Sequence, residues 1–388
     1  MDPSLALFVS IALILVLIRK MNVGYAIFLG ALTLGALTIG YETLDRLVAT
    51  VTSYQTLRIV GIVVSAFTLG FSMQELGLLG TLSEVVSEMM GKFSLATLPA
   101  IVGFLPMPGG ALVSAIMLTD LVKRYGVEAE EATFVNYWFR HLWVPVWPLY
   151  PSFIIGAVVV EASYHTIIYS CYPITLGMIL AGLLFAPREF RLRLGNPWRI
   201  IKSIYPLLLV VVMAIALRID LLLTLPLAIV ILYVHKRPKK EDLGRIFRRT
   251  LDPKIILLIF AVMFYKDLIA FTHSAEIFFN HLREFHVPPP IAAFLLTFVV
   301  GFAVGIEISY SAIALPLLTT FTGVGASLVP KNLMLVFGAG LLGVMLSPLH
   351  LCLILTSEYY SADLGKVYRY LLPAGTVLAV VVWLAYVV

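Results

Sequence analysis

The stretch GFLPMPGGALVS, from Gly103 to Ser114, places two prolines and two glycines in the middle of an apolar run. Proline removes a backbone donor and clashes with the preceding turn, and paired glycines weaken a helix further. The sequence therefore predicts a helix break at Pro106–Gly110. At membrane depth, freed backbone groups must be buried in protein or line a wet cavity. The break is either a hairpin tip that faces a ligand or a kink in a structural helix.

Composition indicates a polytopic membrane protein. Of the 388 residues, 61% are hydrophobic and 13% are charged, and the mean hydropathy is +1.00. The net charge of +5 comes from basic residues gathered in a few connecting segments, which favours a topology signal over nucleic-acid binding. Cys171 and Cys352 lie in apolar segments, so neither a disulfide framework nor a cysteine metal site is predicted.

Twelve apolar segments divide the chain, and most are close to the length of about 20 residues that crosses a bilayer. Segments 94–122 and 289–320 are too long for one span, and each carries a helix breaker near its middle. We expect each to fold back as a re-entrant helical hairpin. Segments 133–160 and 331–357 follow the hairpins, and prolines interrupt both of them, which predicts two broken spans.

The basic connecting segments set the expected topology. If both hairpins return to the side they enter from, four basic segments fall on one side, which the positive-inside rule makes cytoplasmic. Both termini then lie outside a plasma or inner membrane, and 5–18 is a retained first span. The basic residues that carry this expectation are Arg19, Lys20, Lys123, Arg124, Arg188, Arg191, Arg193, Arg199 and those within 235–254.

The order of segments repeats along the chain. Residues 1–190 and 200–388 each give one hairpin and five spans, of which one is broken. Five crossings is an odd number, which makes the two repeats inverted relative to each other. At an offset of 200 residues, Pro148 falls on Pro348. Short amphipathic stretches at 82–90 and 275–286 also correspond. The fold class predicted is therefore an all-α polytopic membrane protein with two inverted repeats.

A substrate site is expected where the breaks meet, because discontinuous helices direct free amides and carbonyls at a ligand near the midplane. The glycines of the first hairpin tip would let an anion approach backbone amides. Backbone and polar groups at the four breaks are the predicted lining. They are Pro106, Met107, Pro108, Gly109, Gly110, Pro148, Ser309, Tyr310, Ser311 and Ser347.

Ionisable residues at membrane depth are few, and each is expensive unless it faces a cavity or a partner. Glu307 at the second tip could carry a proton, bind sodium or fix the hairpin as a neutral acid. His350 could relay a proton, bind substrate or donate a structural hydrogen bond. Arg140 could clamp a carboxylate or extend to the cytoplasmic surface. His141 and Asn136 lie beside it as further substrate-binding candidates.

Two halves that each combine a hairpin with a broken span resemble the ion transporter superfamily, which includes dicarboxylate, citrate and gluconate-type permeases and sodium/proton antiporters. The PMPGG hairpin is similar to that of an uncharacterised prokaryotic integral membrane family within it. This resemblance implies a homodimer whose hairpins and broken spans move as an elevator. The hairpin tips lack the Ser-Asn-Thr motifs of the dicarboxylate carriers.

The sequence favours a secondary transporter that moves a small organic anion with sodium or protons. Sodium is the only cofactor considered, and no resident metal is predicted. The alternative is a cation/proton antiporter in which Glu307 binds the ion. The chain has no Walker loop, HExxH or GxSxG motif, so we do not expect an enzyme. Ser347 with His350 as a hydrolase pair and a channel are the remaining alternatives.

Overall fold

The computed structural model describes the whole chain except residues 18–19, 108, 187–196, 275 and 278–286. Within the described residues every regular element is a helix, as expected for a helical polytopic membrane protein. Six helical stretches are long and apolar enough to cross a membrane: Tyr54–Glu75, Leu78–Val102, Tyr164–Leu183, Trp198–Ala216, Pro330–Tyr360 and Leu364–Val387.

The first half of the chain contains ten α-helices, counted over its described residues. They are α1 (Pro3–Leu17), α2 (Val23–Thr38), α3 (Glu42–Thr52), α4 (Tyr54–Glu75), α5 (Leu78–Met90), α6 (Ser94–Val102), α7 (Gly110–Tyr125), α8 (Ala129–Arg140), α9 (Pro151–Val159) and α10 (Tyr164–Leu183). A 3-10 turn, Gly91–Phe93, joins α5 to α6.

The second half follows the same order in its described residues. Its helices are α11 (Pro197–Val210), the π-helix η2 (Val211–Ala216), α12 (Leu221–Lys236), α13 (Lys240–Thr250), α14 (Pro253–Phe271), α16 (Pro289–Val304), the π-helix η3 (Tyr310–Ala314), α17 (Leu315–Leu317), α18 (Thr319–Thr322), α19 (Pro330–Leu346), α20 (Leu351–Tyr360) and α21 (Leu364–Val387).

Side-chain caps begin many of the long helices. An oxygen at the N-cap accepts a hydrogen bond from an amide of the first turn that has no partner inside the helix. The caps occur at matching places in the two halves. Asn22 and Asp220 cap α2 and α12, Ser53 and Asp252 cap α4 and α14, and Ser163 and Asp363 cap α10 and α21.

Packing between helices is reciprocal as well. Helix α2 packs on α14 while α12 packs on α4, and α3 packs on α14 while α13 packs on α4. Helix α6 packs on α8 as α16 packs on α19, and α10 packs directly on α21. Helices α2, α3, α12 and α13 therefore pack on the opposite half, whereas α6 and α16 each pack on the broken span of their own half.

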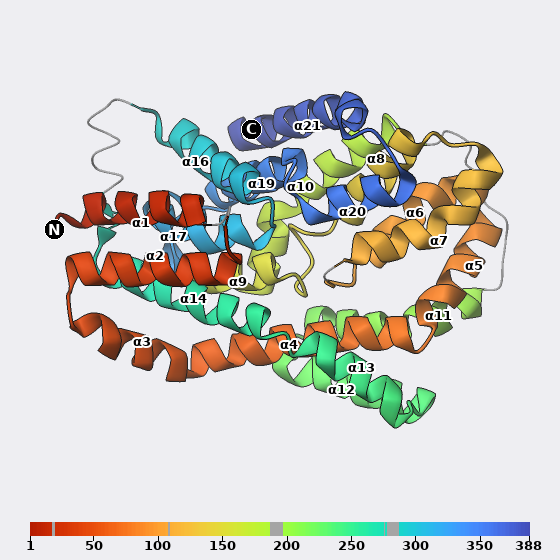
Figure 1. Cartoon of the computed structure of the whole chain (residues 1–388), viewed down its shortest axis with the longest axis horizontal. Helices are drawn as coiled ribbons and strands as arrows, with labels where there is room; N and C mark the ends of the chain where they lie inside the picture. The colour runs from red at the N-terminus through yellow and green to blue at the C-terminus, as the bar shows by residue number, and fades with distance from the viewer. Residues whose placement is uncertain (18–19, 108, 187–196, 275, 278–286) are drawn as a thin grey trace.

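The helices form two groups. The span group comprises α1–α5 and α11–α14, and the hairpin group comprises α6–α10 and α16–α21. The extensive packing lies within each group, and the main contacts between groups are α5 with α6 and α7, α14 with η3 and α17, α1 with α16, and α4 with α9. Within the hairpin group, the α6–α7 pair and the α16–α17 segment lie at opposite ends of the long axis (Figure 1).

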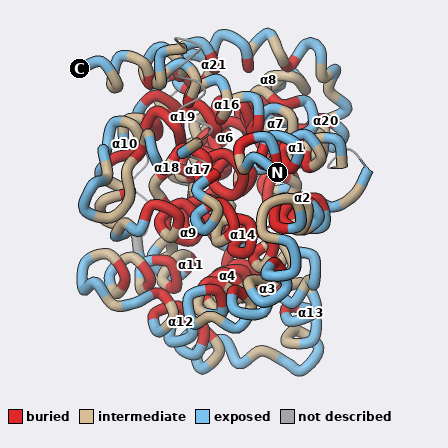
Figure 2. Tube along the Cα trace, turned by 90° about the vertical axis from the view of Figure 1, so that its left-hand side faces the viewer, coloured by how far each residue is buried: buried red, intermediate tan, exposed pale blue. Residues whose placement is uncertain are grey.

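Burial is greatest in the centre of the molecule, around α19 of the hairpin group (Figure 2). The buried residues fill the centre of the molecule, whereas α12, α13 and α21 lie at its periphery and are largely exposed (Figure 2). Helix α19 is buried along most of its length. In α21, only 28% of the most apolar 18-residue stretch is buried. The broken elements therefore lie in the core, and α21 presents an apolar outer face suited to lipid.

The structure changes several expected boundaries. The first hairpin extends to Tyr125, and the first broken span covers 129–159. Helices α3 and α13 were not predicted, because their charged residues favoured connecting segments. In α13, Arg245 and Arg249 lie 3.0 and 3.2 Å from the Glu75 carboxylate at the end of α4. The amphipathic stretch at 82–90 is part of α5, and most of 275–286 lies outside the described residues.

Candidate functional site

The first hairpin tip lies between α6 and α7. Helix α6 ends at Val102, and α7 begins after Gly109, whose φ of 73° is a conformation that glycine adopts without strain. Pro106 and Met107 are buried in this turn, and Gly109 is half-buried. Pro108, another predicted site residue, lies outside the described residues.

Arg140, the last residue of α8, holds this tip. Its side chain is only 3% exposed. Nη1 donates to the carbonyl of Val102 at 3.3 Å, and Nη2 donates to those of Leu105 and Met107 at 3.2 and 3.4 Å. The Val102 and Met107 carbonyls also accept from the amides of Leu105 and Gly110. For the Leu105 carbonyl the guanidinium is the one donor among the described residues, so it supplies a partner that the helix break removed. Arg140 therefore does not extend to the surface.

Two glycines permit this arrangement. A Cβ at Gly110 would overlap the Arg140 guanidinium, lying 2.7 Å from its Cζ atom, and a Cβ at Gly103 would overlap the Arg140 carbonyl oxygen. The amides of Gly110 and Leu112 already donate to the carbonyls of Met107 and Gly109 at 3.1 and 3.0 Å. At this tip the backbone is closed on itself, and the positive charge comes from the arginine.

His141 joins the first broken span to the second hairpin tip. It is 1% exposed. Nδ1 lies 2.7 Å from the Tyr137 carbonyl oxygen, which can only accept, so Nδ1 carries a proton. Nε2 lies 3.2 Å from Oε1 of Glu307. A hydrogen bond across this second contact requires one proton, held on the imidazole or on the carboxyl group.

His350 lies on the other side of His141, at the break before α20. The two rings are 4.9 Å apart at 83°, and the His350 ring also lies 5.2 Å from Tyr137. His350 is 3% exposed, and neither of its ring nitrogens has a hydrogen-bond partner. His141 therefore stands between Glu307 and His350.

A thiol joins this cluster. Ligand atoms of His141, His350 and Cys352 all lie within 4.8 Å of one another. Sequence analysis missed Cys352 as a site residue, although its position two residues after His350, directly beyond a helix break, was a usable signal. These three residues and Glu307 form what we call the histidine cluster.

Asn136 links three broken elements. Its Nδ2 donates to the Ala111 carbonyl in α7 at 2.9 Å and to Thr356 Oγ1 in α20 at 3.1 Å. Its Oδ1 is buried without a partner. Thr356 was not predicted, because a threonine within an apolar helix commonly bonds its own backbone.

The predicted hydroxyls fall into two sets. Ser309 Oγ donates to the Ile306 carbonyl at 2.7 Å, and Ser347 Oγ donates to the Phe302 carbonyl at 2.6 Å. Ser347 thus stabilises the second hairpin and is not directed at His350. The hydroxyls of Tyr310 and Ser311 are buried without a partner, and Pro148 is buried in the break before α9.

Unpaired polar atoms gather on these broken elements. Among the described residues, nine buried side-chain nitrogen or oxygen atoms lack a hydrogen-bond partner, and seven of them belong to the hairpin group. Buried polar groups are normally paired, so such a concentration is typical of a site that receives a ligand or ion. The seven atoms belong to Asn136, Arg140, Ser152, Tyr310, Ser311 and His350.

The breaks bring one arginine, Arg140, near one carboxyl group, Glu307, and two imidazoles, His141 and His350. Glu307 contacts His141 directly, and the His141 ring lies against the His350 ring. An anion is therefore favoured when the pair of His141 and Glu307 holds its proton, and a cation is favoured when that proton has been released.

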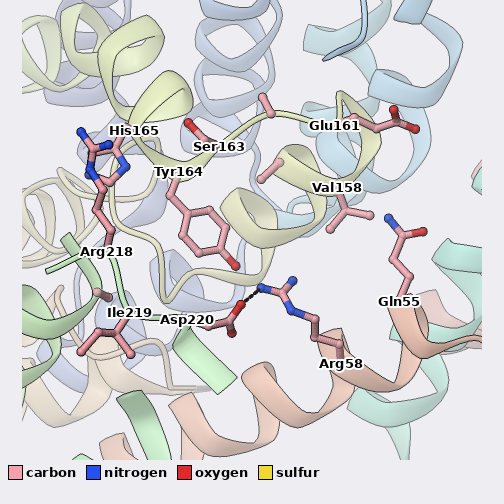
Figure 3. Close-up of a pocket in the computed structure, with 13 residues that line it drawn as sticks. Gln55, Arg58, Val158, Glu161, Ser163, Tyr164, His165, Arg218, Ile219 and Asp220 are labelled. Atoms are coloured by element: carbon pink, nitrogen blue, oxygen red, sulfur yellow. Dashed lines mark hydrogen bonds and ion pairs between the residues drawn. The ribbon is translucent and has the colours of Figure 1, made fainter. Parts of the chain in front are cut away.

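A separate cavity of about 710 Å³ lies at one end of the boundary between the two groups. Its walls come from α4 and the start of α12 in the span group and from residues 157–165 in the hairpin group. Figure 3 shows the pair of Arg58 and Asp220 across its floor, with Tyr164 beside them. No predicted site residue lines this cavity.

A cavity of about 230 Å³ continues along the same boundary, between α14 and residues 316–324. Lys266 of α14 crosses there and donates to the Val158 carbonyl at 3.1 Å. The boundary between the groups is thus hollowed at this end and held by polar contacts.

Comparison with known proteins agrees with a membrane transporter fold. The crystal structure of the Alcanivorax borkumensis YdaH transporter, described as having an unusual topology, matches 100% of this chain and 98% of its own, with a TM-score of 0.61 and 15% identity. No curated protein matches the chain. The family model described as protein of unknown function DUF401 matches residues 2–388. The chain therefore belongs to the DUF401 family.

Proposed function

We propose that this protein is a secondary active transporter that moves a small organic anion, such as a carboxylate, together with protons or sodium. The observation that carries the proposal is the meeting of both hairpin tips at one buried cluster of Arg140, His141, Glu307 and His350. Fold similarity to the YdaH transporter supports the general class.

The proposal includes membership of the ion transporter superfamily, with residues 1–190 and 200–388 as inverted repeats. Reciprocal packing of α2 on α14 and of α12 on α4 supports an internal two-fold relation. The opposite positions of α6–α7 and α16–α17 along the molecule support inversion (Figure 1). The basic segments would then be cytoplasmic, with both termini outside.

An elevator movement is part of the proposal. The hairpin group would carry the site past the span group, which would stay fixed as a homodimer in the cell membrane. Sparse packing between the groups and the cavities along their boundary support a movable interface, because few apolar contacts would have to break.

Proton coupling is favoured over sodium coupling by the contact between His141 and Glu307. One proton bridges this pair, and an anion placed near His141 is attracted more strongly when the imidazole is charged. Binding of the anion and uptake of the proton would therefore favour each other. The alternative is a cation/proton antiporter in which Glu307 exchanges the proton for a metal cation.

Thermal unfolding of the detergent-purified protein tests the proposal, because a ligand that binds only the folded state must stabilise it. We expect one of a panel of small carboxylates to raise the midpoint temperature of unfolding, and to raise it more at about pH 5.5 than at about pH 8. These two values lie on either side of the unperturbed histidine pKa of about 6.5. Stabilisation by sodium or lithium alone, lost in Glu307→Gln, would favour the antiporter. Glu84→Gln, at an exposed acid of α5, is the matched control.

A further inference from the structure

The histidine cluster has the chemistry of a metal site. It brings one thiol and two imidazoles from the two broken spans to within 4.8 Å of one another. Imidazole nitrogen and cysteine sulfur together are the ligands that zinc and its neighbours prefer, whereas magnesium and calcium prefer oxygen. The set therefore selects borderline-soft divalent cations.

Two further features prepare these side chains for a metal. His141 donates its Nδ1 proton to the Tyr137 carbonyl at 2.7 Å, which is the outer contact that a metal-binding histidine usually makes, and this leaves Nε2 as the ligand. His350 is 3% exposed, yet both of its ring nitrogens are unpaired. A buried imidazole without a partner is costly, and a metal ion would satisfy it.

We propose that His141, His350 and Cys352 bind a divalent cation of the zinc class, with the Glu307 carboxylate as the fourth ligand. Glu307 Oε1 already lies 3.2 Å from His141 Nε2. Its side chain is 23% exposed, which leaves it room to turn toward the ion. The proposal uses the location of the candidate transport site but does not require that carboxylates are transported.

Distances and charge both suit such an ion. Ligand atoms held at about 2.0–2.3 Å by one Zn²⁺ lie roughly 3.3–3.8 Å apart in a tetrahedron. The three ligand atoms, within 4.8 Å, would close by about an ångström. One thiolate and one carboxylate balance the charge of the ion, so the occupied site is neutral and tolerable in the membrane interior. Binding releases the thiol proton and the proton shared by His141 and Glu307 to solvent.

An occupied site would join α8, α20 and the second hairpin tip. Because the ion would engage both His141 and Glu307, it would take the groups proposed to couple a proton to anion binding. Zinc is therefore expected to compete with the carboxylate that stabilises the protein. The metal would fix the second tip closed rather than travel with the substrate.

Titration of the full-length purified protein with Co²⁺, under a reducing agent that does not bind metals, tests the site. We expect one equivalent to produce a thiolate-to-cobalt charge-transfer band with tetrahedral d–d absorption, both removed by Zn²⁺. Cys352→Ser should abolish the charge-transfer band. It should also weaken zinc binding by more than the about 10–100-fold typical of losing an outer-shell partner.

Cys171→Ser is the matched control, since Cys171 is the other cysteine of the chain and lies fully buried in α10. It should leave the spectrum unchanged. His350→Ala tests a second ligand independently, and size-exclusion profiles report whether each variant is folded. Absence of the band in the folded parent protein, or its persistence in Cys352→Ser, would overturn the proposal.

The two proposals fail separately. A folded protein that is stabilised by a carboxylate but gives no cobalt band is a transporter without this metal site. A protein that gives the band but responds to no carboxylate keeps the metal site and loses the anion-transport proposal.

Discussion

Each hairpin contacts the broken span of its own half at corresponding positions, where a glycine on one element faces a large side chain on the other. The two elements exchange these roles between the halves. In the first half, Gly110 of the hairpin faces Arg140 of α8. In the second half, Tyr310 of the hairpin faces Gly340 of α19, where an added Cβ would overlap the tyrosine ring. Both pairs let a hairpin and a span approach closely, but the large side chain comes from the span in one half and from the hairpin in the other.

One contact recurs at corresponding positions of the two proposed repeats. Trp147 Nε1 donates to the Phe104 carbonyl at 2.8 Å, and Ser347 Oγ donates to the Phe302 carbonyl at 2.6 Å. These pairs correspond at offsets of 200 and 198 residues. The two tips are therefore closed in the same way but carry different chemistry. Arg140 fixes the first tip, and the second tip carries Glu307, which can exchange a proton.

Gly110→Ala should have the largest effect on stability. The added methyl group displaces the buried Arg140 guanidinium from its three carbonyls, of which the Leu105 carbonyl accepts from no other donor among the described residues. A buried polar group left without a partner costs about 1–3 kcal/mol, and a charged group such as the guanidinium costs more. We expect the free energy of unfolding in detergent to fall by at least about 3 kcal/mol. Gly80→Ala is the control, because a Cβ there meets nothing within 4 Å. An equal, small change in both variants would show that Arg140 does not hold the first tip.

Gly340→Ala should destabilise by overpacking against Tyr310, at about 1–3 kcal/mol. Adding Tyr310→Leu should recover much of this loss, because the contact is apolar apart from the hydroxyl. Adding Arg140→Leu to Gly110→Ala should recover little, because the buried Leu105 carbonyl remains without a donor. Double-mutant cycles on both pairs measure the difference, and equal recovery in the two halves would contradict the contrast between the tips.

Glu307→Gln should cost less stability, about 1–2 kcal/mol, because a neutral hydrogen bond replaces a charge-assisted one at the His141 ring. Its main effect should be on ligand binding. The stabilisation given by a bound carboxylate should no longer increase between neutral and acidic pH, since the bridging proton is gone. Thermal unfolding at several pH values checks this, and an unchanged pH dependence would remove Glu307 from the coupling.

Ser347→Ala and Trp147→Phe should have the smallest and most similar effects. Each removes one donor from a corresponding hairpin carbonyl, which is worth about 0.5–1.5 kcal/mol. Ser347→Ala also removes the acceptor of the Leu349 amide, and Trp147→Phe also loses some packing. The comparison uses unfolding midpoints of the two single variants. A loss several times larger in one half would show that the two hairpins are not closed equivalently.

Much of this organisation could be predicted from the sequence, because prolines, glycines and hydrophobic length act locally. Breaks were predicted at Pro106–Gly110 and Pro348 and lie where α6 and α19 end. Helices α3 and α13 were missed, since their charged residues are satisfied by neighbours such as Glu75, which only the fold brings together. No local sequence pattern shows that these charged residues will have ion-pair partners in the folded protein.

The site shows the same limit. Glu307, His141 and His350 were each identified as expensive charges or donors at membrane depth, but their mutual contacts depend on packing between halves 200 residues apart. The two cysteines did not predict a metal site, because sequence spacing cannot show that Cys352 and His141 lie in one cluster. Arg140 was predicted to clamp a carboxylate or to extend to the surface. It is buried, its Nη atoms donate to carbonyls of the first hairpin, and its Nε has no partner among the described residues.

The most direct test of the central proposal is proton movement into liposomes that contain the purified protein and an internal pH-sensitive dye. A carboxylate selected by thermal unfolding is added outside without any imposed gradient of sodium. We predict acidification of the interior that depends on the carboxylate, persists when potassium replaces sodium, is lost in Glu307→Gln and is retained in Glu84→Gln. Uptake of labelled carboxylate with no accompanying acidification, or acidification that is unchanged in Glu307→Gln, would contradict the account.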